Sequence, residues 1–212
     1  MVCSSCVIGG PFFGRHWVVD RVPTTLLAAL ADLVKWLDAS GMPSMVIGGV
    51  AASVLGRPRL TQDVDALAIL PEGEWANAVS IAARHGIIPR IDNPLDFARR
   101  SRVLLMRHIE SGIDIDVTFG GLLFERAAID KSEIHDIGGL RVRLPRVEDL
   151  LIMKAVARRP KDLQDIEGLL AAHPEADLVT VRQRVSEFAT AMSTSDMLDE
   201  FDKLVARSKL KP

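Results

Sequence analysis

The sequence has no tyrosine, and aromatic side chains make up only 5% of its 212 residues. A protein that reads single-stranded bases by stacking them on aromatic rings needs more of these side chains. A strong net charge is also missing, because 26 basic and 28 acidic residues leave a net charge of −2. No global positive field therefore recruits nucleic acid, and any polyanion must meet local basic clusters.

Long apolar runs are absent as well. No stretch reaches the roughly 18 to 20 residues of a membrane span, and the first residues lack the pattern of a secretory signal. The composition, 48% hydrophobic and 25% charged, is typical of a globular protein. We therefore expect a cytoplasmic protein with no membrane partner.

Cysteine is scarce, with only Cys3 and Cys6 in a Cys-x-x-Cys near the start of the chain. A zinc site would need a second such pair or histidines, and His16 is the only histidine nearby. We expect a reduced, frayed tail, with metal or redox use as the alternative. Residues 1–22 show no clean periodicity and are expected to form an irregular lead-in.

Hydrophobic periodicity predicts an α/β (α+β) core over residues 23–145 and a helical C-terminal portion over 146–212. The core should contain a small mixed sheet flanked by helices. Its expected helices cover 24–39, 50–55 and 72–85, and its expected strands cover 45–47, 63–69, 87–91, 103–109, 113–119, 134–137 and 140–144. Helices are then expected over 147–157, 161–172, 177–191 and 196–207.

The most informative stretch runs from residue 46 to residue 67. An apolar strand stops at Gly48 and Gly49, a short helical segment follows, and Asp63 and Asp65 then alternate along a second strand. Carboxylates at i and i+2 on a strand point to the same side and can bind the same divalent cations. Glycines let backbone N–H groups approach a phosphate. This combination predicts metal-assisted chemistry on a nucleotide.

A third carboxylate should complete such a site, because two metals must be bridged and a hydroxyl must be activated. Asp114 and Asp116 alternate with isoleucine and valine over residues 113–117. A single Asp-x-Asp strand is more often a solvated edge face. Two such strands in one domain, the first preceded by Gly48-Gly49, favour the catalytic interpretation.

Gly48-Gly49, then thirteen residues, then Asp63-Val64-Asp65 resembles the signature of the DNA polymerase β-type nucleotidyltransferase superfamily. Within that superfamily, segments 46–52 and 59–65 are similar to the AbiEii-like toxin nucleotidyltransferases, which include tRNA-modifying toxins. Weaker similarities follow at 115–120, 148–154 and 161–165, so the resemblance covers about residues 44–170.

The resemblance implies a role for each acidic residue. Asp63 and Asp65 would bind two Mg²⁺ ions that also hold a nucleoside triphosphate. Asp116 would complete the metal site on the side of the nucleophile and help to deprotonate the incoming hydroxyl, with Asp114 as the alternative.

Phosphate contacts are expected from the glycine pair and its neighbours. Many relatives have serine as the second residue of the pair, and Gly49 lacks that hydroxyl. The backbone of Gly48 and Gly49 must then suffice, with help from Thr61, which is expected to share the strand face of Asp63. Arg59 either binds phosphate or braces the loop against a carboxylate, and the sequence leaves both roles open.

Lys154 lies in an apolar helical run, where its charge must reach water or meet a partner. One interpretation is a lysine that extends to the rim of the core. The resemblance instead implies that Lys154 contacts nucleotide phosphates, with Asp162 or Asp165 orienting the lysine or the base. Surface ion pairs at a helix start are an equal alternative for these two aspartates.

Together these residues predict a Mg²⁺-dependent nucleotidyltransferase, in which an acceptor hydroxyl attacks the α-phosphate and pyrophosphate leaves. By resemblance, the acceptor is the 3′ end of tRNA, and the protein is the toxin of a toxin–antitoxin pair with a cognate antitoxin. A non-catalytic antitoxin or binding protein of the same fold and a protein-nucleotidylating enzyme remain open alternatives. Candidate RNA-binding residues, otherwise a solvated basic face, are Arg99, Arg100, Arg102, Arg107, Arg141, Arg143, Arg146, Arg158 and Arg159.

Overall fold

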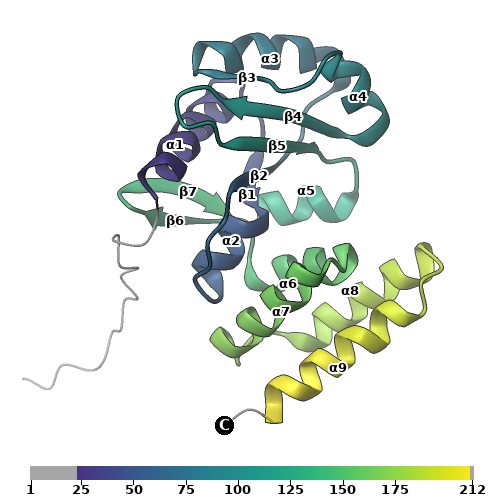
Figure 1. Ribbon diagram of the computed structural model, residues 1–212. Helices are drawn as coiled ribbons and strands as arrows, with labels where there is room; N and C mark the ends of the chain where they lie inside the picture. The colour runs from purple at the N-terminus through teal and green to yellow at the C-terminus, as the bar shows by residue number, and fades with distance from the viewer. Residues whose placement is uncertain (1–22, 211–212) are drawn as a thin grey trace, which may run out of the picture.

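The computed structural model describes residues 23–210 (Figure 1), so the predicted lead-in, with Cys3 and Cys6, lies outside the described residues. The strands are β1 (Ser44–Ile47), β2 (Asp63–Ala68), β3 (Ile87–Pro89), β4 (Val103–His108), β5 (Asp114–Phe119), β6 (Glu133–Ile137) and β7 (Leu140–Leu144). The helices are α1 (Thr24–Ala39), α2 (Gly48–Leu55), α3 (Trp75–Arg84), α4 (Pro94–Ser101), α5 (Leu123–Asp130), α6 (Val147–Ala157), α7 (Pro160–Ala172), α8 (Leu178–Ala191) and α9 (Asp196–Leu210).

Five strands form a mixed sheet in the order β1-β2-β5-β4-β3, and β6 and β7 form a separate hairpin. Only β2 and β5 are parallel; the other neighbours in the five-stranded sheet run antiparallel. Helices α6 to α9 follow β7 and pack together below the sheet in Figure 1. The predicted fold class, a small mixed sheet with flanking helices and a helical C-terminal portion, is therefore confirmed.

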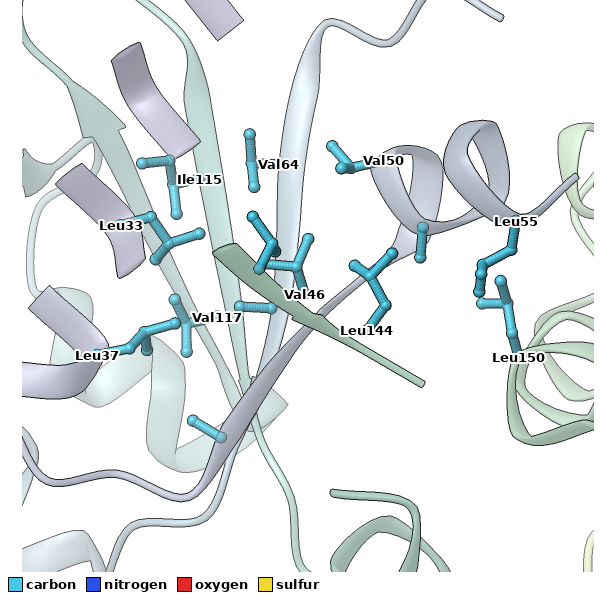
Figure 2. Packing of buried hydrophobic residues seen from close by; sticks show 14 of the residues in the cluster. Leu33, Leu37, Val46, Val50, Leu55, Val64, Ile115, Val117, Leu144 and Leu150 are labelled. Carbon is cyan, nitrogen blue, oxygen red and sulfur yellow. The ribbon is translucent and has the colours of Figure 1, made fainter. Parts of the chain in front are cut away.

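One part of the core lies between one face of the sheet and α1, and the same cluster continues through α2 and β7 into the C-terminal helices. Alternate residues of β2 and β5 point to this face, and Figure 2 shows Val64, Ile115 and Val117 beside Leu33 and Leu37 of α1. All five are almost completely buried. Because burying one such side chain contributes about 1.5 to 3 kcal/mol, this face fixes the strand register, and the acidic residues must take the opposite face.

Helix α2 connects the sheet to the C-terminal helices. Val50 faces the strands, whereas Leu55 at the other end of α2 lies beside Leu150 of α6 (Figure 2). The backbone of Gly56 approaches α7 so closely that an added Cβ would lie 3.2 Å from the backbone nitrogen of Leu169. The segment after the glycine pair is thus held between the sheet and the helical portion.

Two short helices, α4 and α5, were not predicted. Helix α4 starts after Asn93, whose φ is +52°, and has only eight residues, so the helical period repeats only about twice. Helix α5 follows two glycines and exposes Leu123 almost fully, which disguises its buried face. The predicted helix over 72–85 is a 3-10 turn, Glu72–Glu74, followed by α3.

None of the helices in residues 23–210 has the length and apolar character needed to cross a membrane.

Candidate functional site

The parallel pairing of β2 and β5 brings the two Asp-x-Asp segments side by side. Asp63 is the register partner of Asp114, and Asp65 is the register partner of Asp116. Valine and isoleucine residues occupy the intervening positions and are buried on the other face. The same burial that builds the core therefore gathers four carboxylates on the opposite face of the sheet.

Asp65 is the least compensated of these carboxylates. Burial raises its pKa, and the neighbouring charges of Asp63 and Asp116 raise it further, whereas Lys161 and Arg159 partly offset the effect. No hydrogen bond within residues 23–210 reaches its carboxylate. The site thus concentrates negative charge in a place where a cation would be stabilised.

Asp63 is oriented by the loop that precedes β2. Its Oδ1 accepts a hydrogen bond of 3.0 Å from the Thr61 hydroxyl, and its Oδ2 lies 4.0 Å from the Lys161 ammonium group. Thr61 was expected on the strand face of Asp63, but it lies two residues before the strand and contacts Asp63 directly. It acts on the carboxylate from the side of the loop.

Asp116 and Asp114 each pair with an arginine. Arg90 Nη1 donates to Asp116 Oδ1 at 2.6 Å, and Arg90 Nη2 lies 3.4 Å from Asp116 Oδ2. Asp114 accepts from Arg107 Nε at 2.7 Å, which lowers its pKa. Sequence reasoning missed Arg90, because it is isolated in the sequence and reaches Asp116 only through the pairing of β3, β4 and β5.

The glycine pair begins α2 beneath these carboxylates. Gly48 has a φ of +65°, and an added Cβ would lie 1.8 Å from Asp65 Oδ2. At Gly49 an added Cβ would lie 2.5 Å from Thr61 Oγ1. Ile47, the N-cap residue of α2, makes no side-chain cap hydrogen bond. Both positions require glycine, because the buried backbone at the start of α2 packs directly against the side chains of Asp65 and Thr61.

Lys154 is buried rather than extended to the rim of the core. Its Nζ lies 2.8 Å from Asp162 Oδ1 and 2.8 Å from Asp165 Oδ2. Burial acts to raise the pKa of Asp162, but hydrogen bonds from Arg159 and Lys154 outweigh it and lower the pKa. Asp162 and Asp165 are therefore not surface acids. They contact the Lys154 ammonium group, in line with the alternative in which these aspartates orient the lysine.

Arg59, for which the sequence left two roles open, contacts a carboxylate in the structure. Its guanidinium forms two hydrogen bonds with Asp165, at 2.7 and 2.9 Å, and these raise its pKa. Asp165 thus joins Arg59, from the loop before β2, to Lys154 of α6. In this structure Arg59 braces the loop against a carboxylate.

A cavity of about 430 Å³ lies between the sheet and the helical portion. Gly48, Asp65 and Asp116 line one side, and Arg159 lies on another with Lys154. The remaining wall is largely apolar and includes Leu67, Leu122, Phe124, Leu150, Met153, Val156 and Phe188. The Phe124 and Phe188 rings meet edge to face, with centroids 5.5 Å apart. A ligand with both anionic and apolar parts fits these walls.

The predicted residues divide into two groups around this cavity. Gly48, Asp65, Asp116 and Lys154 line it. Gly49, Arg59, Thr61, Asp63 and Asp162 are not among its lining residues and instead support them through the contacts described above.

The acidic residues offer the type of ligand atom that a divalent cation prefers. Hard cations such as Mg²⁺ prefer carboxylate oxygens, and the raised pKa of Asp65 reflects clustered negative charge that a cation would relieve. Asp63, Asp65 and Asp116 are the residues that would hold it. Within the described ranges, however, no three His, Cys, Asp or Glu side chains stand close enough together to hold a metal. Arg90 currently takes both oxygens of Asp116.

The predicted arginine cluster does not form one surface. Arg102 donates to the carbonyl oxygens of Phe119 and Gly120, and its guanidinium lies 5.5 Å from the Trp75 ring centroid. Arg99 pairs with Glu72 and Asp96. Arg107, by contrast, lies on the sheet beside Asp114.

No protein-family model matches the sequence, and no curated protein shows a significant sequence match. The structure resembles the solved structure of the antibiotic-resistance factor ANT(2'')-Ia, with 15% identity and a TM-score of 0.57 over 81% of this chain and 95% of that one. A nucleotidyltransferase-like protein from Paracoccidioides brasiliensis is 16% identical, with a TM-score of 0.45 over 82% and 92% of the two chains. JHP933 from Helicobacter pylori is also 16% identical, with a TM-score of 0.47 over 89% and 92%.

At this level of identity the likeness concerns the fold alone, and of these three structures ANT(2'')-Ia, with a TM-score of 0.57, supports it. Three features agree with the nucleotidyltransferase fold that the sequence predicts. They are the mixed five-stranded sheet, the glycine pair at the start of α2 and the paired Asp-x-Asp strands. The chain has the nucleotidyltransferase fold.

Proposed function

We propose that the protein is a nucleotidyltransferase that uses a nucleoside triphosphate and Mg²⁺. One observation carries the proposal: the parallel register places Asp65 beside Asp116, near the N-terminus of helix α2. Both carboxylates line a cavity that also has an apolar wall. A metal-dependent phosphoryl site requires clustered carboxylates, phosphate donors and a nucleoside pocket in one place.

The chain supplies groups for each part of the nucleotide. The backbone N–H groups of Gly48 and Gly49 meet a phosphate at the helix N-terminus. Arg159 and Lys161 are the basic side chains nearest to Asp65 and Asp63, and both are partly exposed. We assign them to the triphosphate in preference to Lys154, because the Lys154 side chain is almost fully buried between Asp162 and Asp165. The apolar wall with Phe124 takes the base.

In the reaction, the acceptor hydroxyl oxygen forms a bond to the α-phosphorus, and the bond from that phosphorus to the bridging oxygen of the β-phosphate breaks. Pyrophosphate leaves, and the hydroxyl proton passes to the Asp116 carboxylate. Bound divalent ions would supply charge stabilisation at the phosphates. The Asp162–Lys154–Asp165 ion pairs hold α6 and α7 in place, and Arg59 fixes the loop before Asp63.

We further propose that the acceptor is an RNA 3′ end, tRNA in particular, and that the protein is a cytoplasmic toxin with a cognate antitoxin. The sequence resemblance to AbiEii-like toxins supports this acceptor and role. Residues 23–145 would form the catalytic core, and residues 146–212 would close the nucleotide cavity from the helical side.

The experiment is a transfer assay with four α-labelled nucleoside triphosphates, each offered total RNA and cell protein with Mg²⁺. We expect one or more triphosphates to label RNA, and Asp63→Ala to serve as the blank. Label on protein alone would reassign the acceptor. Absence of labelled product and of nucleotide binding would overturn the proposal in favour of a non-catalytic binding protein.

A further inference from the structure

On its acidic face the sheet continues from β5 to β4 and β3, and Val103 at the start of β4 still lines the nucleotide cavity. In the antiparallel pairing of β4 with β5, Leu105 lies opposite Asp116, and Arg107 lies opposite Asp114. On β3, Ile88 lies opposite Arg107. Directly opposed residues in a sheet share a face. Ile88, Arg90, Leu105 and Arg107 therefore lie beside Asp114 and Asp116 on this face, next to the part of β4 that lines the cavity, and we call these four residues the β3–β4 face.

This face is accessible and carries both apolar and basic groups. Ile88 is 41% exposed, and the Arg107 side chain is 52% exposed. None of the four residues lines the nucleotide cavity. Asp116 thus stands between the cavity and the β3–β4 face, where a base for an incoming hydroxyl must stand.

In its present position Arg90 occupies the Asp116 carboxylate, so that Asp116 is not free to bind a metal or a hydroxyl group. Its two terminal nitrogens lie 2.6 and 3.4 Å from the two oxygens of that carboxylate. Asp114 Oδ2 lies 3.7 Å from the same guanidinium, so a second anion is already within reach. A guanidinium binds phosphate in the same two-point manner as it binds a carboxylate.

We propose that Arg90 is a positioning residue that couples the acceptor to the metal: it holds Asp116 until a phosphate of a polynucleotide acceptor on the β3–β4 face takes over the guanidinium. This inference rests on the proposed function. Once Arg90 pairs with the acceptor phosphate, Asp116 becomes available to the metal and to the acceptor hydroxyl. Ile88 and Leu105 supply apolar contact for the sugar and base of the terminal nucleotide.

Charge balance favours a polynucleotide over an uncharged acceptor. Arg90 and Arg107 now face Asp114 and Asp116, which gives two positive and two negative charges. When a cation takes Asp116, Asp114 is the one carboxylate of this group that still faces both Arg90 and Arg107. One positive charge is then left uncompensated, and a backbone phosphate balances it. By reciprocity, acceptor binding must then strengthen metal binding, and metal binding must strengthen acceptor binding.

The first test is Mn²⁺ titration of the protein alone by calorimetry, comparing wild type with Arg90→Gln and Arg107→Gln. Arg90→Gln should bind Mn²⁺ about fivefold more tightly, as expected for removal of a competing, partly exposed ion pair. Arg107→Gln removes the same charge from the same face but leaves Asp116 paired, so its affinity should stay within about twofold of wild type. Equal or weaker Mn²⁺ binding by Arg90→Gln overturns the inference.

The second test is fluorescence anisotropy with a labelled RNA dodecamer, with and without Mn²⁺. Mn²⁺ should tighten RNA binding by wild type more than by Asp65→Asn, which controls for screening of the RNA itself. Arg90→Gln should lose that enhancement. Equal enhancement in wild type and Arg90→Gln overturns the assignment of a polynucleotide to this face.

The two proposals fail in distinguishable ways. If Asp65→Asn abolishes Mn²⁺ binding but Arg90→Gln leaves it unchanged, only the role of Arg90 is wrong. If wild type and Asp65→Asn bind Mn²⁺ equally poorly, the metal site of the proposed function is wrong as well.

Discussion

Asp65 and Asp116 are register partners on the parallel strands β2 and β5, yet within residues 23–210 a side chain forms a direct ion pair with Asp116 and none does so with Asp65. Arg90 pairs with Asp116, whereas no hydrogen bond within residues 23–210 engages the Asp65 carboxylate. Burial of the Asp65 carboxylate is the largest cause of its raised pKa, and repulsion from Asp63 and Asp116 raises this pKa further. Such uncompensated charge destabilises the free protein and favours a bound cation.

Asp65→Asn should accordingly stabilise the metal-free protein, by about 1 kcal/mol near neutral pH, while it abolishes transfer. A raised pKa in the folded state means that the folded protein binds a proton at Asp65 more tightly than the unfolded chain does. The charged form thus costs stability at neutral pH, and the advantage of the variant should fade as falling pH protonates Asp65. Chemical denaturation from pH 7 down to pH 4 measures this difference.

Mg²⁺ provides the control for that experiment. It should stabilise wild type and leave Asp65→Asn unaffected. A variant that is less stable than wild type at pH 7, or one that responds equally to Mg²⁺, would contradict the assignment.

Asp162→Asn should destabilise the protein by about 3 kcal/mol, because it leaves the buried Lys154 ammonium with one carboxylate fewer. Asp202→Asn is the matched control, since Asp202 forms an exposed ion pair with Arg182 and should cost less than about 1 kcal/mol. The pKa of Asp162 is lowered in the folded state, so its contribution is present above the ordinary aspartate pKa near 3.9 and is lost below it. Equal losses in the two variants would refute the role of the buried pair.

Gly49→Ala should reduce both stability and transfer, because the new Cβ would meet Thr61 Oγ1 at 2.5 Å and push it away from Asp63. We expect a loss of about 1 to 3 kcal/mol from this overpacking. Gly73→Ala is the control, since no atom in the described part of the chain lies within 4 Å of the added methyl group. A silent Gly49→Ala variant would show that the close approach at Thr61 is unimportant.

Lys161→Gln should raise the KM for the nucleoside triphosphate by about tenfold, as expected when one charge-assisted contact is lost. The side chain is 44% exposed and lies 4.0 Å from Asp63, so stability should hardly change. Lys35→Gln, which removes another exposed lysine in an ion pair, should leave the KM unchanged. Steady-state kinetics at fixed acceptor separate the two variants.

The fold was largely predictable because local periodicity and register agree. Alternation in β5 placed Asp114 and Asp116 opposite Ile115 and Val117, and the glycine pair marked the end of β1. Helices α4 and α5 escaped prediction because each has only eight residues, and one of the apolar residues of α5, Leu123, is exposed. In both, tertiary contacts supply what the local sequence signal lacks.

The candidate site was predictable only where its residues fall within one motif. The pairing of Arg90 with Asp116 spans 26 residues and depends on the strand order, so no local pattern signals it. The ion pair between Arg59 and Asp165 joins residues 106 positions apart, so the sequence left two roles open for Arg59. Burial of Lys154 was likewise undetermined, because an apolar helix accommodates a lysine at its rim or inside with partners.

The most direct measurement of the central claim compares one nucleoside triphosphate carrying its label at either the α or the γ phosphate. Nucleotidyl transfer predicts that the RNA product retains the α label, that the γ label leaves in pyrophosphate, and that Asp65→Asn gives neither product. Transfer of the γ label, or equal α-labelling by wild type and Asp65→Asn, would contradict the account.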